Sequence, residues 1–144
     1  MKKDSKGLKY KQRTISVWNE VAPFYHKRWA KNEVGPFSVT KKLLELSKIK
    51  KNDTVLDLAC GTGLVTKKLI RKVGSKGDIY ATDSSESAIK IAKKWIGDAE
   101  NLHFIRADAE KIQFNTEFDA ITCQYALFFF PNEQKVLKNM KKFL

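Results

Sequence analysis

The sequence predicts an α/β fold in which helices cover both faces of a parallel sheet. Short apolar runs alternate with segments of helical periodicity from about residue 54 onward. The run TVLDLA is almost continuously apolar, as in strands that are buried on both faces of a sheet. A Gly-Thr-Gly loop follows this run and precedes a helical segment. Such alternation indicates right-handed crossovers between parallel strands.

The segment before the first strand is predicted to be helical in part. Residues 1–15 are polar and basic, and we expect a flexible tail there. In residues 16–31 the large apolar side chains lie close to helical spacing, with a break at Pro23: Trp18, Val21, Phe24 and Trp29. Residues 37–50 place Val39, Leu43 and Leu46 on one face of a further helix.

After the glycine loop the alternation continues. Leu64 begins a helix that ends near Gly74, and DIYATD is the second strand. Ser84 or Ser85 caps the next helix, and Gly97 ends it. LHFIRAD and FDAITCQ are the third and fourth strands, and Asn132 caps a last helix. We expect that last helix to bury one apolar set: Val136, Leu137, Met140 and Leu144.

Composition and charge narrow the class of protein. The 144 residues are enough for one domain, and no apolar run reaches the roughly 18 residues of a membrane-spanning helix. Cys60 and Cys123 are too few for a disulfide framework, and no signal-peptide core follows the N-terminus, so we expect a cytoplasmic protein. The net charge of +12 is compatible with anionic partners, but the lysines are scattered and few aromatic residues lie among them.

The glycine loop is a candidate ligand site. Glycine at 61 and 63 lets a ligand approach the backbone, and the following helix directs its first amides into the same space. Asp57, near the end of the first strand, would repel a pyrophosphate but attract a cation. Asp83, 20 residues after Gly63, can accept hydrogen bonds from ribose hydroxyls. Thr66 stands where dinucleotide sites have a third small residue. These features fit S-adenosylmethionine, which has a ribose and positive charges but no phosphate.

The motifs also carry a family resemblance. VLDLACGTG, then YATDSS, RADAEKIQF and FDAITCQYALFFF, resemble the successive motifs of class I S-adenosylmethionine-dependent methyltransferases. WNEVAPFYHKRW is similar to the N-terminal segment of the ubiquinone/menaquinone-biosynthesis-type methyltransferases. The resemblance covers about residues 16–144, which would form the cofactor-binding part of a methyltransferase domain. It implies a Rossmann-like sheet in the order 3-2-1-4.

The resemblance implies roles for Asp57 and for the loop that follows the first strand. Asp57 and the backbone from Ala59 through Cys60 and Gly61 to Gly63 would hold the methionine part of the cofactor. The Cys60 and Cys123 side chains are expected to be inert. Ala59 stands where many relatives have glycine.

The remaining roles lie around the nucleoside and the methyl group. Asp83 would bind the ribose hydroxyls, with Ser84 beside it near the adenine. Asp108 would accept from the adenine amino group, and the Ala109 amide would face a ring nitrogen. Gln124 would lie below the methionine and the reacting methyl group. In addition, Tyr25 would close over the cofactor. We expect no metal, and the sequence names no catalytic base.

The end of the chain departs from the family pattern. Strands five to seven of the family sheet would follow residue 144, so we expect a truncated domain. Strand four would then be an open edge through which chains could associate, with residues 127–130 uncovered. We favour a methyltransferase of small molecules. The alternatives are a nucleic-acid methyltransferase, which the positive charge favours, and a non-catalytic cofactor-binding fragment.

Overall fold

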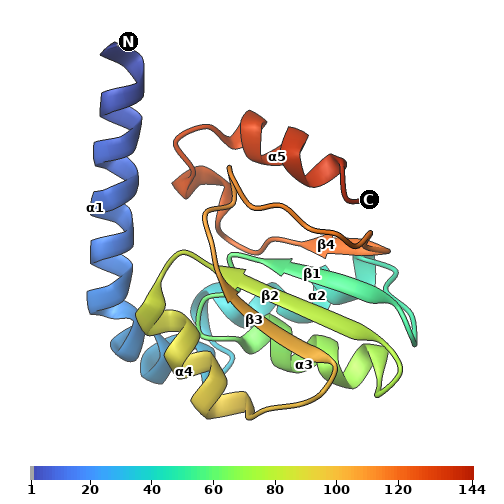
Figure 1. The fold of residues 1–144 in the computed structure, drawn as a ribbon. Helices are drawn as coiled ribbons and strands as arrows, with labels where there is room; N and C mark the ends of the chain where they lie inside the picture. The colour runs from blue at the N-terminus through green and yellow to red at the C-terminus, as the bar shows by residue number, and fades with distance from the viewer. Residues whose placement is uncertain (1) are drawn as a thin grey trace.

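The computed structural model describes the backbone of residues 2–144 and the side chains from residue 5 (Figure 1). The helices are α1 (Lys2–Tyr25), α2 (Thr40–Leu46), α3 (Leu64–Val73), α4 (Glu86–Ile96) and α5 (Glu133–Lys141). The strands are β1 (Thr54–Leu58), β2 (Asp78–Asp83), β3 (Leu102–Arg106) and β4 (Ala120–Thr122). A π-helical turn (His26–Ala30) extends α1, and 3-10 turns cover Gly35–Val39 and Leu127–Phe129.

The four strands form one parallel sheet in the order β3-β2-β1-β4. This confirms the predicted fold class and strand order. On β1, neighbouring residues point to opposite faces. Val55 packs with α2 and α3 on one face, while Leu56 and Leu58 pack with α5 on the other. Because both faces of β1 are covered, its sequence is apolar apart from Thr54, at its partly buried start, and Asp57.

The predicted helix caps are confirmed. The Ser85 hydroxyl accepts a hydrogen bond from the Ala88 amide at the start of α4, at 3.1 Å. The Asn132 side chain accepts from the Lys135 amide at the start of α5, at 2.9 Å. Both helices therefore begin where a side chain satisfies an otherwise unpaired amide.

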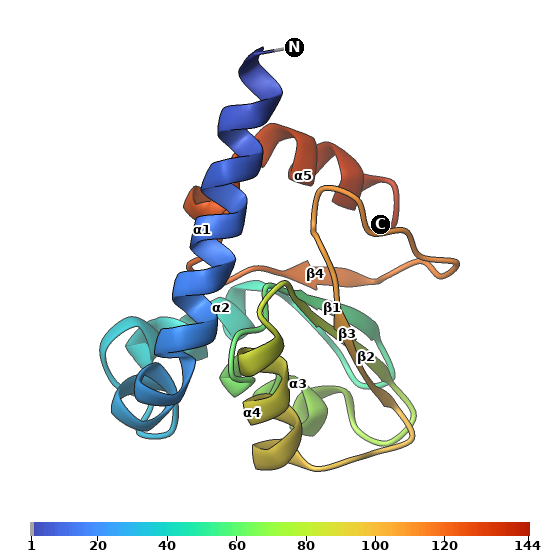
Figure 2. The ribbon, with the colours of Figure 1, turned by 60° about the vertical axis from the view of Figure 1, so that its left-hand side comes forward.

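Helix α1 differs from the prediction. We expected residues 1–15 to be flexible and Pro23 to break the helix, but one helix of 24 residues covers residues 2–25, and residue 1 lies outside the described backbone. It stands beside the sheet and packs along α4 (Figures 1 and 2). An interior proline costs a helix about 3 kcal/mol. Burial of Ala22 and partial burial of Trp18 and Tyr25 on the same helical face offset that cost.

Three other apolar assignments were wrong. In α2 the buried residues are Thr40 and Leu44. Of the predicted set, Leu43 is partly buried and packs against the core, whereas Val39 and Leu46 are exposed. Phe24, which helical spacing grouped with Trp18 and Val21, is 67% exposed. In the last helix, α5 ends at Lys141, and Leu137 and Leu144 are exposed. Val136 and Met140 are buried as predicted.

The segment after β4 is also not an extension of the strand. Residues Leu127–Phe129 form a 3-10 turn, which brings Phe129 back against α1. Among the described helices, none is both long and apolar enough to cross a membrane.

Candidate functional site

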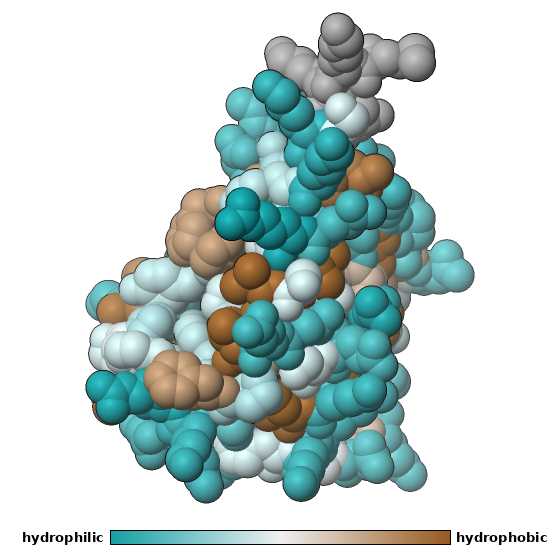
Figure 3. Space-filling model, turned by 90° about the vertical axis from the view of Figure 1, so that its left-hand side faces the viewer, coloured by the Kyte–Doolittle hydropathy of each residue, from teal (hydrophilic) through white to brown (hydrophobic). Residues whose placement is uncertain are grey.

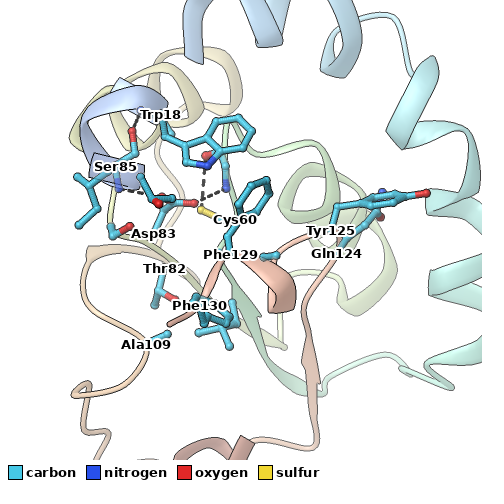
Figure 4. A pocket seen from close by; sticks show the side chains of 18 of the residues that line it. Trp18, Cys60, Thr82, Asp83, Ser85, Ala109, Gln124, Tyr125, Phe129 and Phe130 are labelled. Carbon is cyan, nitrogen blue, oxygen red and sulfur yellow. Dashed lines mark hydrogen bonds between the residues drawn. The ribbon is translucent and has the colours of Figure 1, made fainter. Parts of the chain in front are cut away.

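A pocket lies at the carboxyl ends of the strands, between the sheet and α1 (Figure 4). Loops after β1, β2, β3 and β4 each contribute to it, because parallel strands end at the same edge of a sheet. Ten of the predicted site residues line it: Tyr25, Asp57, Ala59, Cys60, Gly61, Asp83, Ser84, Asp108, Ala109 and Gln124. Gly63, the other predicted residue, does not.

Asp57 is buried at the end of β1, where two threonine hydroxyls hold it. Thr66 donates to Oδ2 at 2.6 Å, and Thr122 donates to Oδ1 at 3.0 Å. Burial raises the pKa of Asp57 to about 6, although both hydroxyls lower it. The carboxylate is thus fixed in orientation and lacks a cationic partner among the described residues. Thr66, which looked like an unusual loop residue in the sequence, is one of its two donors.

The glycines of the loop have different roles. Gly61 has a φ of +56°, lines the pocket, and a Cβ there would meet nothing within 4 Å. Gly63 has a φ of +96°, and a Cβ there would lie 2.8 Å from Ile96 Cδ1 and 3.0 Å from Ala92 Cβ. Gly63 therefore allows the loop to pack on α4. Ala59 also has a positive φ, of +55°, which explains why glycine suits that position.

This difference predicts unequal costs of substitution. Gly61→Ala should lower the free energy of unfolding by about 1–2 kcal/mol, the cost of a left-handed conformation for an L-residue. Gly63→Ala should cost roughly 1–3 kcal/mol more, because the methyl group must also displace Ile96 and α4. Urea unfolding of the two variants measures the difference. Equal costs would show that the loop does not pack on α4 as described.

Asp83 lies at the end of β2, across the glycine loop from Asp57. Its Oδ2 accepts from the Gly61 amide at 2.9 Å, and its Oδ1 accepts from the Ser85 amide at 2.8 Å. Burial raises the pKa of Asp83 above its ordinary value, against the effect of these amides. Each oxygen keeps lone-pair capacity for a further donor.

Asp108 is in contact with α1. Lys11 Nζ lies 2.9 Å from Asp108 Oδ2 and 3.2 Å from Glu110 Oε1. Burial alone would raise the pKa of Asp108, but the hydrogen bond and charge of Lys11, together with the Glu110 amide and the charge of Lys111, outweigh burial and lower that pKa. No pattern in the sequence pairs residues 97 positions apart, so Lys11 was not predicted as part of the site.

Gln124 follows β4 and turns its amide toward the N-terminal segment. Its Nε2 donates to the Pro36 carbonyl oxygen at 3.1 Å and to Thr40 Oγ1 at 3.0 Å. These bonds fix the orientation of the amide. Its Oε1 is buried without a partner among the described residues, although Gln124 lines the pocket. A ligand N–H group could satisfy this acceptor.

Aromatic side chains form a second side of the pocket. Trp18 contacts Tyr25 and Phe129 edge to face, with ring centroids 5.2 and 5.4 Å apart. Tyr25 contacts Phe37 in the same way at 5.6 Å. In Figure 4 Trp18 and Phe129 lie between Asp83 on one side and Gln124 on the other. We call these four residues, Trp18, Tyr25, Phe37 and Phe129, the aromatic wall. Only Tyr25 was predicted.

His26, for which no role was predicted, links the N-terminal segment to the glycine loop. Its Nδ1 lies 3.0 Å from Thr62 Oγ1, and its ring packs edge to face on Trp95 with centroids 4.7 Å apart. Burial lowers the pKa of His26, and Lys31 and Lys67 lower it further. The neutral imidazole is therefore favoured beside Thr62.

The pocket brings together acceptor oxygens that follow three different strands. Asp57, Asp83 and Gln124 all line it, and each has an oxygen that can accept a further hydrogen bond. Gly61 leaves room at the backbone between the two carboxylates. The parallel sheet in the order β3-β2-β1-β4, with a pocket at the carboxyl ends of its strands, defines the class: a Rossmann-like domain.

Comparison with known proteins specifies the family. The methyltransferase domain family matches residues 55–144, so the chain belongs to it. The ubiquinone/menaquinone biosynthesis C-methyltransferase UbiE of Azotobacter vinelandii is 34% identical over 105 residues, which cover 70% of this chain and 42% of that protein. The Pseudomonas fluorescens protein of the same name is also 34% identical, over 70% of this chain and 41% of its own length. The chain thus spans about two fifths of these relatives.

Solved structures agree with this assignment. A putative methyltransferase from Bacillus halodurans superposes with a TM-score of 0.66 at 28% identity, over 74% of this chain and 46% of that one. A SAM-dependent methyltransferase from Aquifex aeolicus has a TM-score of 0.67 at 24% identity, over 78% of this chain and 63% of that one, and supports the fold. The class I methyltransferase resemblance found in the sequence is confirmed.

Proposed function

We propose that the pocket binds S-adenosylmethionine and that the chain forms the cofactor-binding part of a methyltransferase acting on a small molecule. The observation that supports this most strongly is the pair of carboxylates on adjacent strands, Asp57 and Asp83, separated by the open backbone at Gly61. When bound, the cofactor would supply an activated methyl group. The small-molecule acceptor is inferred from the names of the UbiE relatives.

In this proposal the residues of the chain bind the cofactor and orient it. Asp57 and the free Gln124 oxygen attract an ammonium group, and Ala59, Cys60 and Gly61 provide backbone around it. Asp83 holds the ribose hydroxyls, with Ser84 beside it. The aromatic wall excludes water on the opposite side. Methyl transfer requires alignment of donor and acceptor above all, and a rigid pocket of this kind supplies it.

Helix α1 contributes to the part of the pocket where we place the adenine. Asp108 and the Ala109 amide line the pocket where we place the base. Because Lys11 and the Glu110 amide already use one lone pair on each Asp108 oxygen, the carboxylate has fewer acceptors left for an adenine amino group. We propose that Asp108 serves the base with its remaining lone pairs.

Binding calorimetry tests the cofactor assignment. S-adenosylhomocysteine, the demethylated product, should bind to the chain, while NAD should give no heat. NAD brings a pyrophosphate that Asp57 repels, and Lys11, the one lysine among the described residues that line the pocket, is already paired with Asp108 and Glu110. Tighter binding of NAD than of S-adenosylhomocysteine would overturn the assignment.

A nucleic-acid acceptor is the second candidate, supported by the net charge of +12. The side of α1 turned to the viewer in Figure 3 is largely hydrophilic, with apolar side chains between. Several lysines are engaged with carboxylates, including Lys11, Lys68, Lys90 and Lys135. Tight, sequence-selective RNA binding at physiological salt would favour this second candidate.

Self-association of chains through the edge of β4 stays a prediction.

A further inference from the structure

Asn19 joins α1 to the first turn of α4. Its side-chain oxygen Oδ1 accepts two hydrogen bonds, from Ser85 Oγ at 2.8 Å and from the Ser87 amide at 3.2 Å. Asn19 is partly buried, and it does not line the pocket. Its neighbour Trp18 does line the pocket and belongs to the aromatic wall. Any effect of Asn19 on a ligand must therefore pass through another residue.

Ser85 is the residue through which Asn19 can act. Ser85 is 1% exposed, and its single hydroxyl hydrogen is donated to Asn19. The same hydroxyl accepts from the Ala88 amide, which caps α4. Its backbone amide donates to Asp83 Oδ1 at 2.8 Å. The Ser85 hydroxyl is thus held by Asn19 and Ala88, and the Ser85 backbone amide is held by Asp83. Neither group can rotate freely.

Asp83 completes a continuous path of hydrogen bonds. Its second oxygen accepts from the Gly61 amide at 2.9 Å. The path therefore runs from Asn19 on α1 through Ser85 and Asp83 to the glycine loop after β1. In Figure 4 Ser85 and Asp83 lie on the same side of the pocket, beside Trp18. Three segments far apart in the sequence meet in this path: residues 19, 83–85 and 61.

We propose that Asn19 is a positioning residue for the cofactor site: by holding Ser85, it fixes the orientation in which the Asp83 carboxylate faces the ligand. The inference rests on the proposed function, because it assumes that Asp83 binds the ribose. An asparagine suits this place because its neutral amide oxygen accepts from a hydroxyl and from an amide at once. A side chain without an acceptor would leave the Ser85 hydroxyl and the Ser87 amide unpaired.

Two roles for Asn19 have to be separated by experiment. If Asn19 only docks α1 on α4, its removal lowers stability, and any loss of affinity is the same whether or not Asp83 is present. If Asn19 acts through Asp83, its effect on affinity disappears once the Asp83 carboxylate is removed. A double-mutant cycle with Asn19→Ala and Asp83→Ala distinguishes these roles.

The cycle is measured as affinity for S-adenosylhomocysteine on the whole chain. Asn19→Ala should weaken binding about three- to tenfold, the range for one lost hydrogen bond, and should weaken the Asp83→Ala protein less than twofold further. Asn19→Asp, which keeps an acceptor, should restore most of the affinity. Asn32→Ala is the matched control: Asn32 is exposed and donates only to the nearby Lys27 carbonyl oxygen, so affinity should not change. An equal loss in both backgrounds, or no loss at all, refutes the inference.

A second measurement needs no ligand. The Asp83 carboxyl can be titrated by carbon-13 NMR in the wild-type, Asn19→Ala and Ser85→Ala chains. Both substitutions loosen the amide that donates to Asp83, so the pKa of Asp83 should rise further above its ordinary value in each. If that pKa does not move, the inference is wrong whatever the ligand does. If it moves while the wild-type chain binds no S-adenosylhomocysteine, the coupling of Asn19 to the Asp83 carboxyl is confirmed, and the proposed function is the part that fails.

Discussion

Replacing Asp83 with alanine should weaken binding of S-adenosylhomocysteine by roughly 1.5–3 kcal/mol, or about tenfold to 150-fold. The carboxylate is the acceptor at the end of β2, and its two oxygens are already oriented by the amides of Gly61 and Ser85. Without it, ribose hydroxyls lose a charged partner in a buried place. The two amides lose theirs as well, so the glycine loop becomes less fixed. Calorimetric titration of the folded variant measures the loss.

Two further variants make this test specific. Asp83→Asn keeps the shape, but it turns an NH₂ group toward one of two amide donors, so it should bind nearly as poorly as alanine. Asp78→Ala is the matched control, because Asp78 lies at the opposite end of the same strand and contacts His103 on the surface. Its affinity should equal that of the wild-type chain. If Asp83→Ala binds as tightly as Asp78→Ala, the ribose assignment is wrong.

The sheet and the two carboxylates could be predicted because local patterns determine them. A run such as TVLDLA is apolar on both sides only when helices cover both faces, and the structure shows α3 on one side of β1 and α5 on the other. Asp57 and Asp83 follow from position alone, since the carboxyl ends of neighbouring parallel strands meet. Ser85 and Asn132 were found because capping depends on residues three positions apart.

What the sequence did not predict depends on contacts between distant segments. Lys11 belongs to the site only because α1 is straight enough to bring it to Asp108, and a proline at 23 suggested the opposite. The aromatic wall joins Trp18 to Phe129, residues more than a hundred positions apart. A spacing argument placed Trp18 with Phe24, whereas the face that packs inward carries Ala22 and Tyr25. Helical spacing alone left the choice of face open.

Gly63 belongs to the predicted glycine loop, but its role in the structure differs from the predicted one. The sequence placed both glycines against the ligand. In the structure Gly61 lines the pocket, but the missing side chain of Gly63 makes room for Ile96 and Ala92 of α4. The distinction depends on where α4 packs, which no pattern within the loop reports.

The affinity for S-adenosylhomocysteine should depend on pH through Asp57. Burial raises the pKa of this carboxyl to about 6 in the free chain, against the two threonine hydroxyls that lower it, while the charge of Asp83 raises it further. A ligand ammonium beside Asp57 favours the ionised form. Binding should therefore be independent of pH above about 7 and weaken by up to tenfold per pH unit below about 6, because a proton must then be released. Calorimetry in two buffers with different ionisation enthalpies measures that proton release directly.

The raised pKa of Asp57 also predicts how the stability of the fold depends on pH. Between the ordinary pKa of 3.8 and about 6, the folded chain holds a proton on Asp57 that the unfolded chain has lost. The free energy of unfolding should thus fall as pH rises through this window, by about 3 kcal/mol in all, and then level off. Asp83 has a raised pKa and acts in the same direction, whereas the lowered pKa of His26 acts in the opposite one. The test is therefore the difference in free energy of unfolding between the wild-type chain and the Asp57→Asn chain, measured by urea unfolding from pH 4 to 7. A difference that stays constant across this range, together with an affinity that does not change below pH 6, would show that Asp57 is ionised throughout and that burial does not control its charge.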